Sequence, residues 1–225
     1  MILAAGASSR FGSAKALAPW QNGTLLSTAI TKGQFVSNKK VIVVLGGHAE
    51  TIRPHVKVAT VFNLDWQKGI GASIAAGVRA VIERDQTADT ILILPIDQPL
   101  VSIEHLQKLI ASVSSERSVL TVENDVVGPP VAIARAHFSK ALLLDSEKGM
   151  KSVLDESEFT LVEGTQSLDD IDTVKDLKLL SAANRLFLRP ISKNPLSEFF
   201  ANFNLTLKNL NTFKKKESSY ENECK

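Results

Sequence analysis

The amino-acid sequence predicts an α/β fold of three layers, with helices on both faces of a mostly parallel sheet. Two continuous apolar runs, 41–45 and 91–94, are rich in Ile, Val and Leu, as is typical of strands buried on both faces. A helical pattern of small and apolar residues over 71–84 lies between them, and such alternation favours parallel crossovers. Ligands of these sheets bind beyond the carboxyl ends of the strands.

The first part of the chain follows this alternation closely. Gly46 and Gly47 allow a turn directly after the run 41–45. The chain begins inside its first apolar run, so we expect that strand to fray at its start. The expected elements are strands over 2–5, 41–45 and 58–62, a helix over 25–36 and a short helical segment over 49–55.

The remainder is less regular. The run 91–94 is the most apolar strand, and the prolines at 95 and 99 end it around Asp97. Thr173 or Asp172 would cap the last helix. We expect helices over 71–84, 103–113, 136–144, 148–154 and 172–183, and strands over 119–122, 131–134 and 159–162.

Sheet-type patterns end near residue 183, which predicts one main domain over 1–183 and an extension over 184–225. Spaced Phe and Leu residues over 196–210 predict an amphipathic helix that packs onto the main domain or onto a partner. The extension carries eight Lys and Arg against four Asp and Glu, and we expect its basic end to be disordered. A solvated terminus is favoured over contact with nucleic acid or anionic lipid.

Composition excludes several classes of function. The single cysteine, Cys224, rules out an intrachain disulfide and a cysteine metal site. No apolar run approaches the roughly 18 residues of a membrane span, and no basic segment precedes an apolar one as in a signal peptide. We therefore expect a cytoplasmic protein that binds neither a membrane nor nucleic acid.

The loop after the first strand, Leu3 to Lys15, is the strongest functional signal. Its small residues let backbone approach a ligand, at Gly6, Ser8, Ser9 and Gly12. Backbone N–H groups of such a loop bind phosphate, and Arg10 and Lys15 would neutralise a triphosphate. An ordinary Gly/Ser turn is the alternative, but it needs neither cation. The glycine spacing fits neither the Walker loop nor the dinucleotide fingerprint.

The segment Leu3-Ala-Ala-Gly-Ala-Ser-Ser-Arg-Phe-Gly12, with Lys15, resembles the signature loop of the MobA-like nucleotidyltransferases, most of all the molybdenum cofactor cytidylyltransferase branch. The resemblance covers about residues 1–183 and implies a Rossmann-like nucleotidyltransferase fold. It implies nucleotide binding by the loop, at Leu3, Ala4, Ala5, Gly6, Ser8, Ser9 and Lys15. We expect Arg10, Lys15 and Asp97 to be the catalytic residues.

Two carboxylates are candidate metal ligands. Asp97 follows a strand that should be buried, where a carboxylate needs a partner, and Mg²⁺ takes carboxylate together with phosphate oxygens. A cap for the next helix is the alternative, but that helix begins too far along the chain. Asp172 belongs to an acidic segment that would ordinarily cap a helix. The resemblance implies that Asp172 is a second metal ligand, with Asp170 beside it.

Two further segments resemble substrate-binding segments of this family. Asn63 and Ser73 match the polar positions of the segment that binds the base and sugar, although an Asn turn and a helix N-terminal hydroxyl would also account for them. Residues 128–131 resemble the segment that holds the second substrate. The family then has Gly-Asp-x-Gly-Ala-Arg where this chain has Ser-Glu-Lys-Gly-Met-Lys at 146–151, so Glu147 keeps the acid and Lys151 the cation.

These features together predict Mg²⁺-dependent transfer of CMP from CTP to a molybdopterin-type acceptor, with release of pyrophosphate. The attacking phosphate is already ionised, so charge neutralisation and positioning are needed rather than a base. Ala5 and Gln98 favour CTP over GTP in the family, and a guanylyltransferase or another small-molecule nucleotidyltransferase is the alternative. A second alternative is a non-catalytic nucleotide-binding partner of a molybdoenzyme.

Overall fold

The computed structural model describes residues 1–164 and 169–187. The chain divides into two compact units, Met1–Asp176 and Leu177–Lys225. The second unit is described only over residues 177–187, which belong to helix α6 (Val174–Phe187). The expected helix over 196–210 and the basic end of the chain lie outside the described residues.

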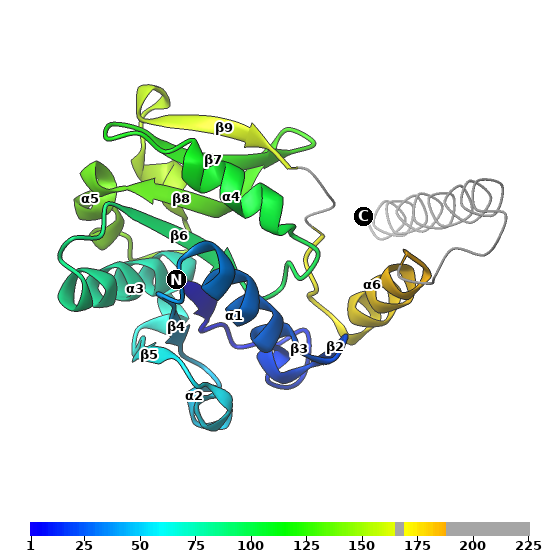
Figure 1. Cartoon of the computed structure of the whole chain (residues 1–225). Helices are drawn as coiled ribbons and strands as arrows, with labels where there is room; N and C mark the ends of the chain where they lie inside the picture. Colours follow the sequence, from blue (N-terminus) through cyan, green and yellow to red (C-terminus); the bar gives the residue numbers. More distant parts are fainter. Residues whose placement is uncertain (165–168, 188–225) are drawn as a thin grey trace, which may run out of the picture. The chain divides into compact units, whose positions relative to one another are not determined.

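A seven-stranded sheet forms the centre of the first unit, in the order β5-β4-β1-β6-β8-β7-β9 (Figure 1). Every strand runs parallel to the others except β8, which is antiparallel to β6 and β7. The prediction of a mostly parallel sheet is therefore confirmed. The strands are β1 (Ile2–Ala4), β4 (Ile42–Leu45), β5 (Ala59–Phe62), β6 (Thr90–Pro95), β7 (Ser118–Glu123), β8 (Val126–Ala134) and β9 (Phe159–Glu163).

Helices cover both faces of this sheet, which confirms the three layers. Helices α1 (Leu25–Val36) and α4 (Ile103–Ala111) bury their apolar sides in one core with one face of β1 and β4. Helices α3 (Ile70–Arg84) and α5 (Phe138–Leu142) form a second core on the other face. None of the helices in the described residues combines the length and apolar character needed to cross a lipid bilayer.

Local sequence explains how these helices form. Thr24 accepts a hydrogen bond from the N–H of Ser27, and the Ser27 hydroxyl accepts one from the N–H of Thr24, so this capping box begins α1. Gly77 brings α3 close to the sheet, because a Cβ at this position would lie 2.8 Å from a methyl of Val44. Burial of these small and apolar faces is the main source of the fold's stability.

Two expectations are wrong. The segment 148–154 is not a regular helix, because only Met150–Val153 forms a 3₁₀ turn between extended residues. The first strand is not frayed: the Met1 amino group donates to the carbonyl of Leu92 at 2.8 Å, and Ile2 is 1% exposed.

Other elements differ from the sequence prediction in extent or were absent from it. The helix expected over 136–144 is a 3₁₀ turn followed by the short α5. The small hairpin of β2 (Pro19–Trp20) and β3 (Gly23–Thr24) was not expected. Helix α2 (Ala49–Ile52), which a 3₁₀ turn over Arg53–His55 follows, fits the short helical segment predicted there.

Candidate active site

Four neighbouring strands end at the same edge of the sheet, and the predicted site residues follow them. In sheet order, Asn63 follows β5, Gly46 follows β4, Gly6 comes just after β1, and Asp97 comes just after β6. A pocket of about 680 Å³, which we call the main pocket, opens at this edge. It is lined by every site residue that the sequence predicts except Asn63: Leu3, Ala4, Ala5, Gly6, Ser8, Ser9, Arg10, Lys15, Ser73, Asp97 and Asp172.

The loop after β1 is held in shape by its own backbone. The carbonyl of Ser8 accepts hydrogen bonds from the N–H groups of Phe11 and Gly12, both at 3.0 Å. The Ser8 hydroxyl accepts one from the N–H of Lys15 at 3.3 Å. Ser8 and Gly12 both have positive φ, of 52° and 79°, so the chain reverses tightly at each. The loop therefore curls back on itself over residues 8–15 and brings Lys15 to the pocket.

The turn after β4 supports the first part of this loop. Gly47 donates its N–H to the carbonyl of Ala5 at 2.9 Å, and the His48 Nε2 lies 2.7 Å from the carbonyl of Ala7. Gly46 must be glycine for this approach, because a Cβ there would lie 2.5 Å from the Ala5 carbonyl oxygen. The His48 side chain thus bonds to the backbone of the loop.

The cations of the loop meet the predicted carboxylates directly. The Lys15 Nζ lies 2.8 Å from Asp97 Oδ2 and 3.4 Å from Asp172 Oδ1, and Arg10 lies 2.9 Å from Asp172 Oδ2. Lys15 is 9% exposed, so water screens its pairs weakly, whereas the Arg10 side chain is 71% exposed. The two carboxylates thus converge on one buried ammonium.

A long-range backbone bond brings the acidic segment to Asp97. The N–H of Ile171, whose side chain is fully buried, donates to the Asp97 carbonyl at 2.8 Å. Beyond it, Asp176 accepts from the N–H of Thr173 and donates its own N–H to the Thr173 hydroxyl, a capping box at the start of α6. Asp172 is fixed between these two anchors. Of the two residues predicted as the cap of this helix, Thr173 and Asp172, Thr173 is the one that caps it.

Asp170 lies beside the same pair of carboxylates. Partial burial of its carboxyl, reinforced by the negative charges of Asp97 and Asp172, raises the pKa of Asp170 to about 6. A hydrogen bond from the side chain of Gln98 works in the opposite direction. Gln98 is buried and bonds within the protein in this way, and it is not among the residues that line the pocket.

Asn63 and Ser73 bond to each other. The Asn63 Nδ2 donates to the Ser73 hydroxyl at 3.0 Å, and the Asn63 Oδ1 accepts from the N–H of Asp65 at 3.0 Å. Both side chains are buried, but Ser73 lines the main pocket, whereas Asn63 lines a smaller neighbouring pocket of about 300 Å³ beside His48. The pair fixes the start of α3 to the end of β5.

The wall of the main pocket also includes side chains that were not among the candidate site residues, such as Trp66, Gln67 and Glu147. Of these, only Glu147 was named from the sequence, as the acid of the 146–151 segment. Trp66 and Gln67 lie within the 63–73 segment, whose family resemblance could have indicated them. Glu147 reaches the pocket because the backbone carbonyl of Ser146 accepts a hydrogen bond from the N–H of Gly71 at 2.8 Å. Gly69, with φ of 119°, allows this contact, since a Cβ there would lie 2.6 Å from the N of Glu147.

This architecture agrees with a model of the MobA-like NTP transferase domain, which matches the chain over residues 1–161. The chain belongs to this family. The protein is therefore a nucleotidyltransferase, as the loop sequence indicates, and the identification made from that loop is confirmed.

Individual relatives of the chain differ in the nucleotide that their names specify. The molybdenum cofactor cytidylyltransferase of Escherichia coli (strain K12) is 28% identical over 183 residues, which span 78% of this chain and 91% of that protein. A probable molybdenum cofactor guanylyltransferase of Bacillus thuringiensis (strain Al Hakam) is also 28% identical, over 73% of this chain and 82% of the relative. These equal identities leave the choice of base open.

A solved structure with the same fold contains a metal. The structure of Rv0371C from Mycobacterium tuberculosis H37Rv, in complex with manganese, is 25% identical to this chain, with a TM-score of 0.64. It covers 81% of this chain and 96% of its own. In the described residues of this chain, no group of three or more His, Cys, Asp or Glu side chains is arranged to hold a metal alone. Any metal held by Asp97 and Asp172 would need further ligands, and phosphate oxygens are suitable.

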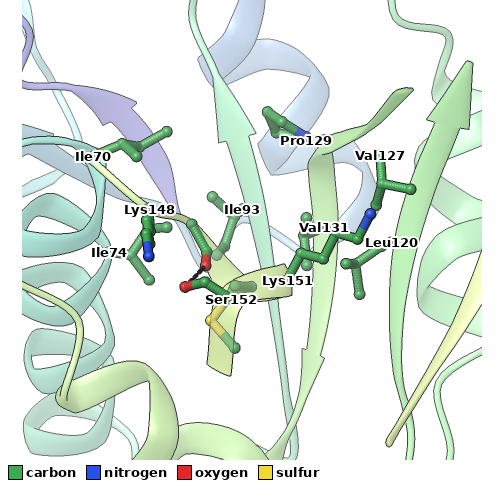
Figure 2. Close-up of a pocket in the computed structure, with 13 residues that line it drawn as sticks. Ile70, Ile74, Ile93, Leu120, Val127, Pro129, Val131, Lys148, Lys151 and Ser152 are labelled. Carbon is green, nitrogen blue, oxygen red and sulfur yellow. Dashed lines mark hydrogen bonds between the residues drawn. The ribbon is translucent and has the colours of Figure 1, made fainter. Parts of the chain in front are cut away.

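A second pocket, of about 510 Å³, adjoins the first at Ile70, which lines both. Figure 2 shows its apolar walls, with Lys148 on the side of Ile74 and Lys151 on the side of Val127. Both lysines come from the 146–151 segment, where this chain departs from the family pattern. The other lining residues are Ile93, Leu120, Gly128, Pro129, Val131, Gly149, Met150 and Ser152.

His137 does not form a competing catalytic site. The Nδ1 of His137 lies 2.8 Å from the Ser118 hydroxyl, and its Nε2 lies 3.6 Å from Glu158, in an order that superficially matches a nucleophile triad. Ser118 is fully buried, however, and its hydroxyl also accepts the N–H of Ala134 at 3.0 Å. A substrate could not reach it, so this line of hydrogen bonds joins strands of the sheet.

Proposed function

We propose that this protein transfers CMP from CTP to the phosphate of a molybdopterin-type acceptor, with Mg²⁺ as the metal and pyrophosphate as the second product. The observation that carries the proposal is the convergence of Asp97 and Asp172 on Lys15, beside a loop of backbone N–H groups. This arrangement combines cations for a triphosphate with carboxylates for a divalent metal.

The triphosphate would lie over the loop after β1, with Arg10 and Lys15 against its oxygens. In the structure, Lys15 pairs with Asp97 at 2.8 Å and Arg10 pairs with Asp172 at 2.9 Å. On binding, these cations would exchange the carboxylates for phosphate oxygens, and Asp97 and Asp172 would become available as ligands. Mg²⁺ held there would neutralise charge on the triphosphate and its leaving group.

The acceptor phosphate needs no residue to deprotonate it, because its ionised oxygen is already the nucleophile. Attack at the α-phosphorus forms one P–O bond and breaks the bond to pyrophosphate, which leaves in line. The chain's contribution is therefore the placement of two anions and the neutralisation of their charge. The pocket supplies this through Arg10, Lys15 and backbone groups, and this chemistry requires no Ser, Cys or His nucleophile.

The choice of CTP rests on Ala5, which lines the pocket beside the turn at Gly46. Its methyl group occupies space that a glycine would leave for a larger purine. Gln98 supports this choice only indirectly, since its side chain bonds to Asp170 and does not line the pocket. Transfer of GMP from GTP is accordingly the second candidate, favoured by the similarity to a guanylyltransferase.

The acceptor would occupy the second pocket, which adjoins the first at Ile70. Its apolar walls suit the flat body of the acceptor, and Lys148 and Lys151 offer two positive charges to anionic groups. Among the described residues, neither lysine forms an ion pair with a carboxylate. An acceptor lying there would direct its phosphate toward the main pocket, where the α-phosphate of the nucleotide would lie.

Pyrophosphate release tests the proposal. The protein is incubated with Mg²⁺, molybdopterin and each of CTP, GTP, ATP and UTP, and Asp97→Asn serves as the inactive control. We expect release with CTP to exceed release with the other triphosphates at least tenfold. A preference for GTP would establish the second candidate. Binding of CTP without release from any triphosphate would favour a non-catalytic partner of a molybdoenzyme instead.

A further inference from the structure

A lysine of α1 forms hydrogen bonds to the loop that carries Asp97. Lys32 lies in the middle of α1, and its Nζ donates hydrogen bonds to the carbonyls of Pro99 at 2.5 Å and Val101 at 2.6 Å. Both carbonyls belong to the irregular segment between β6 and α4. We infer that Lys32 is a positioning residue for the metal-binding carboxylates, an inference that rests on the proposed function.

The segment is fixed in part by apolar packing, because Ile96 and Val101 are buried in the same core as α1 and α4. Its backbone makes few hydrogen bonds of its own. Pro99 has no N–H and cannot bond to a neighbouring carbonyl through its amide. The N–H of Val101 lies 3.3 Å from the carbonyl of Gln98, within the segment itself. The two carbonyls that Lys32 binds therefore give this stretch a polar attachment to α1 beside that apolar packing. Charge-assisted bonds of this kind are stronger than neutral ones.

The position of Lys32 is electrostatically unfavourable in itself. Burial lowers the pKa of Lys32 to about 8, and in the described residues its ammonium forms no ion pair that would offset this desolvation. An apolar side chain could fill the same place against the segment without this cost. The benefit of an ammonium here is the pair of backbone bonds.

Movement of this segment would displace both candidate metal ligands. Asp97 lies two residues before Pro99, and its carbonyl accepts the N–H of Ile171, which precedes Asp172. Gln98 adds a third link, through its side-chain bond to Asp170. Lys32 thus acts on Asp97 through the backbone, and on Asp172 through Asp97. Misplacement of reacting groups by about 1 Å can cost on the order of 100-fold in rate.

The test compares Lys32→Met, Lys32→Arg and Lys32→Gln with wild type, and Lys108→Met on α4 is the control because Lys108 is exposed. Binding of Mn²⁺ in the presence of CTP is measured by electron paramagnetic resonance, together with CTP binding in EDTA, kcat and Tm. We expect Lys32→Met to raise the Mn²⁺ dissociation constant about tenfold and to lower kcat, with CTP binding in EDTA unchanged. Lys32→Arg should restore most of the Mn²⁺ affinity, and Lys108→Met should match wild type.

A purely structural role for Lys32 gives a different result. In that case Lys32→Met lowers Tm but binds Mn²⁺ with wild-type affinity at temperatures well below its Tm, and the inference is overturned. If Lys32→Met does not fold, Lys32→Gln replaces it and is expected to lie between wild type and a tenfold loss. Should the wild-type protein release no pyrophosphate, the proposed function fails, but the comparison of Mn²⁺ affinities still decides the role of Lys32.

Discussion

The ammonium of Lys15 lies 2.8 Å from the carboxylate of Asp97, although the two residues are 82 positions apart in the sequence. Lys15 also approaches Asp172 at 3.4 Å, so a single cation holds together two carboxylates that would otherwise repel each other. In the proposed reaction this cation belongs to the triphosphate, and the carboxylates belong to the metal. The charges of these cations and carboxylates therefore balance one another within the protein.

This internal pairing predicts that nucleotide and metal bind cooperatively. Metal alone must compete with Lys15 for the carboxylates, and nucleotide alone must compete with the carboxylates for Lys15 and Arg10. Once both ligands are present, each group gains a new partner. We expect Mg²⁺ to increase CTP affinity at least tenfold, measured by isothermal titration calorimetry, and CTP to increase metal affinity by the same factor. Independent affinities would contradict the exchange of partners.

Replacement of Lys15 by Met should remove most of the activity. The variant loses a cation at the triphosphate and leaves Asp97 without its ion-pair partner, while Asp172 keeps Arg10. We expect kcat/KM to fall about 1,000-fold, equivalent to roughly 4 kcal/mol of transition-state stabilisation. Steady-state release of pyrophosphate measures this change. Lys57→Met, at an exposed lysine, is the matched control and should retain full activity.

The stability of the metal-free protein should depend on Asp170. Because the folded state raises the pKa of this carboxyl to about 6, the folded protein binds more protons than the unfolded chain between about pH 4 and pH 6. The contribution of Asp170 to stability is therefore greatest below pH 4 and is lost as the pH rises through 6. Asp170→Asn should raise the free energy of unfolding at pH 7.5 and leave it nearly unchanged at pH 4.

Urea unfolding in EDTA at the two pH values measures this difference. Asp170 is exposed, so screening by water reduces the size of the change in unfolding free energy, and the direction of the change is the criterion. A destabilisation by Asp170→Asn at pH 7.5 would show that hydrogen bonds to the ionised carboxylate outweigh its burial and its acidic neighbours.

Much of the fold follows from local sequence. The apolar runs at 41–45 and 91–94 became the buried strands β4 and β6, and the predicted bounds of α1 match those observed. The edge at which Gly6 and Asp97 meet followed from parallel topology alone, because strand ends of one direction share one edge. Asp172 was different: its place depends on the bond from Ile171 to Asp97, so only family resemblance indicated it.

The predictions that were wrong or incomplete concern contacts between segments that are distant in the sequence. The stretch 148–154 has helical composition, but its start is fixed when Ser146 accepts the N–H of Gly71. Glu147 reaches the pocket through that same packing of loop against helix, and Trp66 lies against the turn at Gly46 and Gly47. Lys32 reads as a surface lysine on an amphipathic helix, and only the course of the 96–101 segment shows that its ammonium is bonded. Sequence periodicity contains no information about such pairs.

Removal of the two lysines of the second pocket should affect the acceptor and not the nucleotide. Lys148 and Lys151 line only that pocket, whereas Arg10 and Lys15 line only the first. We expect Lys148→Ala and Lys151→Ala each to raise the KM for the acceptor about tenfold, with the KM for CTP unchanged. Because both lysines are exposed, salt should screen their attraction and raise the wild-type acceptor KM in the same way.

The double variant should lose this dependence on salt, which distinguishes an electrostatic role from a change in pocket shape. Lys108→Ala, an exposed lysine outside both pockets, is the control and should behave as wild type. An equal rise in KM for CTP and acceptor would place both substrates in contact with the 146–151 segment, and the assignment of the second pocket to the acceptor would then be wrong. An unchanged acceptor KM in both single variants would exclude that assignment as well.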